Sequence, residues 1–90
     1  MTYIRVQWKH SLADEPVLMY SELDDARWEV RKVEVFTDGR CGFASRTVAA
    51  GGTRLGKEPI PPLTEIAADP QFLPTEIDQA EFEAIWANRA

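Results

Sequence analysis

The sequence predicts an α+β domain, in which a four-stranded, mostly antiparallel sheet packs against a C-terminal α-helix and a Gly/Pro-rich crossover loop joins them. Two patterns support this fold class. Apolar and polar side chains alternate over much of the first half, as in half-buried strands, and a helix-start signal precedes a 3.6-residue apolar repeat near the end. The length of 90 residues suffices for one hydrophobic core and not for two, so residues 1–90 are expected to form a single domain.

The first two strands are predicted at residues 2–9 and 17–22. In the first, every second side chain from Ile4 to Trp8 is apolar, which is the period of a strand with one buried face. In the second, apolar side chains again fall two residues apart. The stretch between them is rich in Asp, Glu and Ser and ends in proline, so it predicts a turn.

The third and fourth strands are predicted at residues 27–36 and 41–44. Asp38-Gly39 lies between them, and this dipeptide favours a tight hairpin turn because both of its central residues can adopt positive φ. The two strands are therefore expected to be antiparallel neighbours. The apolar positions of the third strand change parity in its middle, which predicts a β-bulge near Arg31 or Lys32.

The last third of the chain predicts a loop followed by helices. Residues 49–62 contain three glycines and three prolines, too many for a regular element. Residues 63–68 are expected to form one or two helical turns, which end before Asp69-Pro70. Asp78 and the glutamate three positions later fit a capping box, so the final helix is predicted at residues 79–88.

The final helix carries one apolar stripe, formed by Phe82, Ile85 and Trp86 and ending at Arg89. We expect this stripe to lie across the apolar sides of the first two strands, because a small sheet usually covers itself in this way. The predicted sheet face consists of Ile4, Val6, Trp8, Leu18 and Tyr20.

The formal net charge is −5, and the acidity is unevenly distributed. Residues 1–57 hold nine Lys or Arg against eight Asp or Glu, whereas residues 58–90 hold one against seven. The chain therefore lacks the basic surface that binds nucleic acid and the cationic amphipathic helix that binds membranes, and neither partner is expected. With no apolar run long enough to span a membrane and no signal-like leader, a cytoplasmic protein is predicted.

Cofactor and metal chemistry find little support in the sequence. Cys41 is the only cysteine and His10 the only histidine, so an internal disulfide and a Cys/His zinc cluster are both excluded. Glu22, Asp24 and Asp25 form a carboxylate cluster without the glycine and ligand spacing of a calcium loop. We predict no cofactor, no metal site and no catalytic residue.

Three groups of residues are candidates for binding. Arg27, Trp28 and Arg31 lie along a mixed-charge strand, where an exposed tryptophan beside charged residues indicates a contact surface for a protein. Retained binding after changing all three would exclude this surface.

The second and third groups lie in loops. Gly51, Gly52, Thr53 and Arg54 open a glycine-rich loop whose backbone amides could contact an anion or a peptide, although it lacks the spacing of a phosphate-binding loop. His10 lies near two acids, as a general base would, and also suits a turn histidine bound to the backbone.

Several motifs along the chain resemble a family of small uncharacterised bacterial domains. The resemblance implies a protein of about this length without established enzyme activity, and families of this kind often occur beside toxin and immunity proteins. It supplies no catalytic residues. The motifs are Trp8-x-His10, Asp14-Glu15-Pro16, Tyr20-Ser21-Glu22-x-Asp24, Arg31-Lys32-Val33-Glu34-x-Phe36, Asp38-Gly39, Gly51-Gly52-Thr53-x-Leu55-Gly56 and Phe82-x-x-Ile85-Trp86.

The function that these observations favour is a non-enzymatic protein-interaction module, of the immunity or antitoxin kind, with a protein partner of unknown identity. A module that binds a small ligand or anion through residues 51–56 is the alternative, and a small hydrolase or nuclease built on His10 ranks third. An exposed sheet edge would also support a homodimer, so both a monomer and a homodimer are compatible with the sequence.

Overall fold

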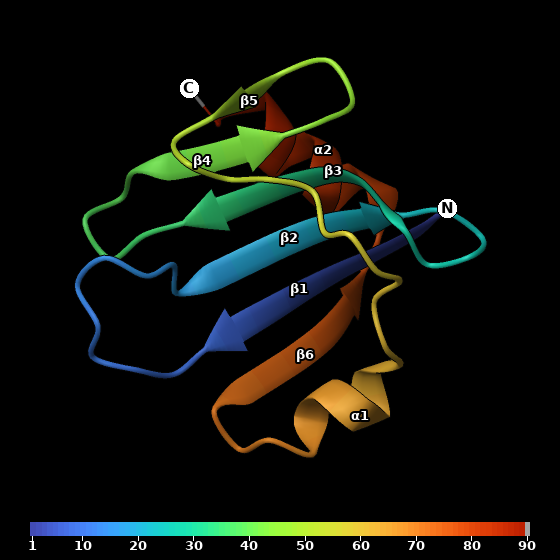
Figure 1. The fold of residues 1–90 in the computed structure, drawn as a ribbon, viewed down its shortest axis with the longest axis horizontal. Helices are drawn as coiled ribbons and strands as arrows, with labels where there is room; N and C mark the ends of the chain where they lie inside the picture. The colour runs from blue at the N-terminus through green and yellow to red at the C-terminus, as the bar shows by residue number, and fades with distance from the viewer. Residues whose placement is uncertain (90) are drawn as a thin grey trace.

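The structure is a computed structural model that describes residues 1–89. It contains a six-stranded antiparallel sheet with the strand order β5-β4-β3-β2-β1-β6 and two helices (Figure 1). The fold is therefore α+β, as predicted, with two strands more than expected. The elements are β1 (Thr2–Trp8), β2 (Leu18–Leu23), β3 (Glu29–Val35), β4 (Cys41–Ala44), β5 (Ala49–Ala50), α1 (Leu63–Ala67), β6 (Phe72–Ile77) and α2 (Gln79–Ala87).

The four-stranded prediction did not include the two outer strands, β5 and β6. β5 has only two residues, too few for any periodic pattern to appear. β6 contains Pro74, which cannot donate a backbone hydrogen bond and therefore argues against a central strand. In the structure β6 is an edge strand that pairs only with β1, so the missing donor is tolerated there.

The predicted β-bulge is present in β3, one residue before the expected position. Glu22 lies opposite Arg31 while Leu23 lies opposite Glu29, so Val30 is the extra residue. Side chains two residues apart normally share a face of a strand, but the bulge breaks this rule. Glu29 and Arg31 consequently point to opposite faces of the sheet.

The face that α2 covers, which we call the helix face, differs from the predicted one. The ring of Phe82 lies 5.5 Å from that of Tyr3, and the ring of Trp86 lies 5.9 Å from that of Phe43. Ile4 and Val6 therefore lie on the opposite face, and the predicted packing of α2 on them is wrong. Leu18 and Tyr20 do share the helix face, because they pair with Gln7 and Arg5.

The physical reason for the error is the amphipathic character of Tyr3 and Arg5. Both alternate with the apolar residues of the first strand, and the alternation therefore places them on its solvent side. A tyrosine ring and an arginine stem can nevertheless cover apolar surface while their polar ends bind elsewhere. Arg5 makes an ion pair with Glu81 of α2 at 2.8 Å. The predicted cap of α2 is confirmed, since the Asp78 carboxylate accepts a hydrogen bond from the Glu81 backbone amide at 2.8 Å.

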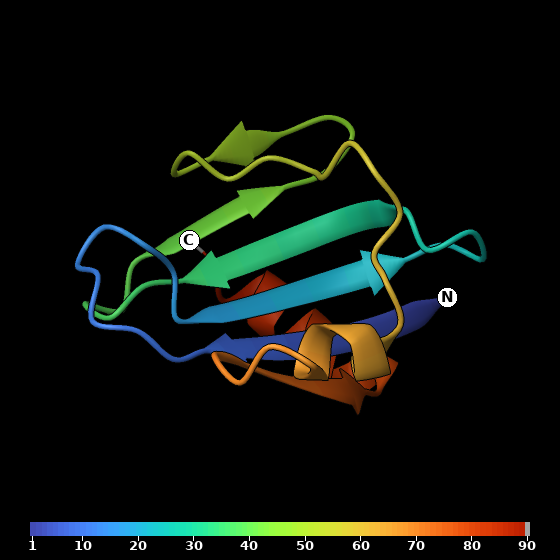
Figure 2. The same cartoon turned by 60° about the horizontal axis from the view of Figure 1, so that its bottom comes forward.

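The other face of the sheet, which we call the groove face, is covered by the segment that leads into α1 and by α1 itself. Figure 2 shows α1 on the side of the sheet opposite α2. The centre of the groove face is a core of Ile4, Val6 and Leu23. The side chains that pack against this core come mostly from outside the sheet and are Met19, Ile60, Leu63, Ile66 and Phe72.

Candidate functional site

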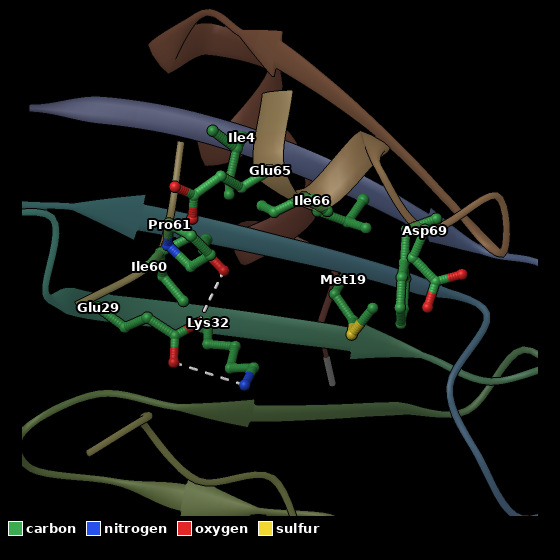
Figure 3. A pocket seen from close by; sticks show the side chains of 12 residues that line it. Ile4, Met19, Glu29, Lys32, Ile60, Pro61, Glu65, Ile66 and Asp69 are labelled. Atoms are coloured by element: carbon green, nitrogen blue, oxygen red, sulfur yellow. Dashed lines mark hydrogen bonds and ion pairs between the residues drawn. The ribbon is translucent and has the colours of Figure 1, made fainter. Parts of the chain in front are cut away.

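The groove face contains a hollow of about 350 Å³, which we call the groove (Figure 3). It forms because α1 has only five residues and does not fill the space over β1, β2 and β3. The floor and walls are mainly apolar, and the groove lies at the lower end of the range of roughly 300–1,000 Å³ that is typical of ligand pockets. Its apolar lining consists of Ile4, Val6, Met19, Ile60, Pro61, Ile66 and Phe72.

One end of the groove carries a hydrogen-bonded group of polar side chains. The buried Glu29 carboxylate accepts hydrogen bonds from the Ser21 hydroxyl at 2.9 Å and from the Gly56 backbone amide at 2.6 Å. Lys32 approaches the same carboxylate at 3.5 Å, the outer limit of a hydrogen bond. The hydrogen-bonding capacity of the carboxylate is thus used. The Lys32 ammonium, in contrast, has no partner other than Glu29 among residues 1–89, so some of its N–H donors are spare.

The rim of the groove is acidic. Glu65 on α1 is exposed and makes neither an ion pair nor a side-chain hydrogen bond within the described part of the chain. Asp69 accepts a hydrogen bond from the Gln71 backbone amide at 2.9 Å and is otherwise open to solvent. Three carboxylates and one lysine line the groove, so its formal charge is −2.

Arg27, one of the predicted contact residues, supports a wall of the groove. Its backbone lies in the left-handed region with φ of 68°, which is unusual for a residue other than glycine. Its guanidinium donates to the carbonyls of Ile60 and Pro61 at 2.8 and 2.9 Å, and its own carbonyl accepts from the Ile60 amide at 2.8 Å. These three bonds fasten the segment before α1 beside the sheet.

The structure does not bring the three predicted contact residues together. Trp28, immediately before β3, is 42% exposed and stays available for contact. Arg31 points to the helix face, where it binds Glu22 at 2.6 Å and Glu83 at 2.7 Å. Its guanidinium also lies 4.9 Å from the centre of the Phe82 ring, so its binding capacity is consumed within the molecule.

The cluster around Arg31 perturbs the ionisation of its neighbours. Hydrogen bonds from Arg31 lower the pKa of Glu22 and of Glu83 below their ordinary values. Burial raises the pKa of Tyr3, and its hydrogen bond to the Glu22 carboxylate, 3.0 Å long, acts in the same direction. The cluster holds α2 onto the sheet.

The glycine-rich loop packs closely against β4. Gly51 and Gly52 have φ of 69° and 80°, a region that favours glycine. Thr53 is buried and donates its hydroxyl hydrogen to the Glu34 carboxylate at 2.7 Å. A side chain at Gly42 would collide with that hydroxyl oxygen, so the contact between loop and strand depends on glycine. Arg54 is exposed beside it.

His10 serves as a turn histidine. Its Nε2–H donates to the Pro16 carbonyl at 2.8 Å, and its Nδ1 accepts from the Leu12 amide at 2.9 Å. Both ring nitrogens are therefore engaged in holding the loop between β1 and β2, with the Trp8 ring 4.2 Å away. Within residues 1–89, no three His, Cys, Asp or Glu side chains are grouped so that they could hold a metal ion.

Sequence reasoning missed the groove because it placed α2 on the face where the groove lies. One signal pointed there. Ile60, Leu63 and Ile66 are apolar residues in a Pro-rich segment and a short helix, and such residues must bury their side chains somewhere. Once α2 is assigned to the other face, this segment is the remaining cover for Ile4 and Val6.

Comparison with known proteins identifies a family and no individual relative. A family model described as "Domain of unknown function (DUF6881)" matches residues 2–90, which agrees with the small uncharacterised domain family that the motifs resemble. No curated protein and no solved structure matches the chain. No helix in residues 1–89 is long and apolar enough to cross a membrane.

Proposed function

Because the chain belongs to this family of unknown function, we propose a function from its structure, namely a protein-interaction module that binds an apolar side chain of its partner in the groove. The observation that carries the proposal is the groove itself, a hollow of about 350 Å³ with apolar walls on a face whose centre is hydrophobic core. An apolar anchor inserted there would be removed from water on several sides. Such anchors supply most of the binding energy in many interfaces.

Burial of one large apolar side chain would stabilise the complex by about 1.5–3 kcal/mol, before the cost of association is subtracted. The polar end of the groove would fix the orientation of the bound segment. Glu29 and Ser21 already satisfy each other, while Lys32 can donate to a backbone carbonyl of the partner. A few oriented polar groups at the end of an apolar hollow are typical of binding sites.

A second candidate is a small ligand with an apolar body and an acceptor group, which the spare donors of Lys32 favour. Binding of a ligand at Gly51, Gly52, Thr53 and Arg54, and an immunity or antitoxin role, stay predictions from the sequence. We rank the protein partner first because the rim residues Glu65 and Asp69 are exposed outside the apolar floor. An occupant that uses them extends beyond the hollow, as a peptide segment does.

The test requires a variant that fills the groove and a matched variant that does not. Met19→Trp places a large ring in the hollow, whereas Gln7→Trp adds the same ring at an exposed position on the helix face. Peptides selected against the wild-type domain from a displayed random library provide the probe. Melting temperatures establish that both variants are folded.

We expect Met19→Trp to weaken peptide binding at least about tenfold, the loss of about 1.4 kcal/mol, and Gln7→Trp to leave it unchanged. Peptide titration into ¹⁵N-labelled protein should shift the amide signals of Met19, Lys32 and Ile66. Equal binding by both variants, with shifts confined to Trp28 or to Gly52 and its neighbours, would reject the groove as the binding site.

A further inference from the structure

The charges around the groove specify the chemistry of its partner. We propose that the segment bound in the groove is basic, with a lysine or arginine on each side of its apolar anchor, and that one of these cations pairs with Glu65 and the other with Asp69. The inference rests on the proposed function, because it describes the occupant of the same groove.

Some acids of the C-terminal third pair with other groups of the fold, and others do not. Residues 58–90 contain seven acids and one base. Glu81 and Glu83 are paired with Arg5 and Arg31, and Asp78 caps α2. These three acids hold α2 in place and are not available to a partner.

Glu65 and Asp69 have no such partner within the described residues, and both line the groove. Glu65 lies in the first turn of α1 without forming a side-chain cap, and Asp69 lies beyond the last residue of the helix. Two carboxylates without a cationic partner among residues 1–89, at the rim of an apolar hollow, favour a cation next to an apolar group and disfavour an anion there.

The groove also has a direction. Figure 3 places Glu29 and Asp69 toward opposite ends, with Met19 between them, and Lys32 on the side of Glu29. Glu65 lies beside Pro61 at the end where Glu29 lies. An acceptor of the bound segment, such as a backbone carbonyl, therefore fits Lys32, while one cation fits Glu65 at that end and the other fits Asp69 at the opposite end. The net charge of −5 adds a long-range attraction for a basic partner.

The experiment uses two displayed libraries of nine-residue peptides with an apolar residue at the centre. In one library lysine flanks the centre, in the other glutamate does, and all other positions are random. Binders are retained only if Met19→Trp weakens them, so every retained peptide occupies the groove. We expect retained binders to come from the lysine library.

For the strongest retained peptide, the double variant Glu65→Gln/Asp69→Asn should bind about 2- to 30-fold more weakly, the range for two exposed ion pairs. Asp25→Asn removes one exposed charge at the turn between β2 and β3 and should change binding by less than about 1.5-fold. Raising salt from about 0.05 to 0.5 M should weaken the wild type more than the double variant, because salt screens exposed charges.

The outcomes separate the two proposals. Groove-dependent binders from the glutamate library, or equal affinity of the wild type and the double variant, would overturn the basic partner and leave the groove as the site. Binders that ignore Met19→Trp in both libraries, or no binders at all, would overturn the groove, and the basic partner with it.

Discussion

The two faces of the sheet are closed by very different means. On the helix face, the nine-residue helix α2 places the fully buried Phe82 between the sheet and its own backbone. On the groove face, the five-residue helix α1 contributes only partly buried side chains and leaves a hollow. The helix face is packed mainly with aromatic rings, whereas the groove face is mainly aliphatic and leaves a hollow unfilled.

The charges follow the same division. Arg31 on the helix face binds two carboxylates and lies over two aromatic rings, so nothing of its guanidinium is left for a partner. Lys32, its neighbour in the chain, points to the groove face and makes one long contact with Glu29. Of these two adjacent residues, Arg31 therefore fastens α2 to the sheet, whereas Lys32 keeps donors that have no other partner among residues 1–89.

The largest loss of stability is expected from removing the Phe82 side chain. Phe82→Ala leaves a cavity under α2 and should lower the free energy of unfolding by about 3–5 kcal/mol. Urea denaturation followed by tryptophan fluorescence measures the loss, and Phe82→Leu, which retains more volume, should cost less. A loss below about 1 kcal/mol would mean that α2 is not docked in solution.

Arg31→Met ranks next. It keeps a long apolar side chain but leaves the buried Glu22 carboxylate without its cation, which should cost about 3 kcal/mol. The control is Arg40→Met, which removes the exposed ion pair with Asp38 and the contact of the guanidinium with the Phe36 ring, and should cost less than about 1 kcal/mol. Similar losses in the two variants would contradict the assigned difference between a buried cluster and a surface pair.

The same cluster makes stability depend on pH in the acidic range. The pKa values of Glu22 and Glu83 are lowered in the folded state, so their contribution is present above the unfolded value of about 4.3 and is lost as the pH falls below it. Unfolding free energy measured between pH 7 and pH 3 should fall, and the fall should be shallower in Arg31→Met. Parallel curves would show that the cluster does not supply this dependence.

The smallest loss of stability is expected at the groove. Met19 is only partly buried and borders a hollow, so Met19→Ala should lower the free energy of unfolding by about 1 kcal/mol, below the range for a filled core. Comparison with Phe82→Ala in the same denaturation series measures the difference between the two faces. A loss of about 3 kcal/mol or more would indicate that the groove is filled in solution.

The sequence predicted the elements better than it predicted their packing. The first four strands, the Asp38-Gly39 turn and the capped final helix follow from local patterns, which periodicity and turn chemistry report directly. The face that α2 covers depends instead on whether Tyr3 and Arg5 act as polar or as apolar residues. Only the tertiary structure decides this, since both side chains have two characters.

The candidate site was harder to predict for a related reason. Arg27 and Arg31 were chosen as exposed charges, but the fold uses both for internal hydrogen bonds that join segments distant in the sequence. The groove is a space between separate elements, and the local patterns of consecutive residues do not report on such a space. Its lining residues come together only when β6 and α1 are placed beside β1.

The bulge at Val30 has a consequence for how this family can vary in length. The loss of one residue from a regular strand moves every side chain after it to the opposite face of the sheet, much as a deletion shifts a reading frame. Deletion of Val30 would restore an unbroken ladder and keep Glu22 opposite Arg31 and Leu23 opposite Glu29, whereas deletion of Val33 would shift the frame. Members of the family that differ by one residue in β3 are therefore expected to differ at this position.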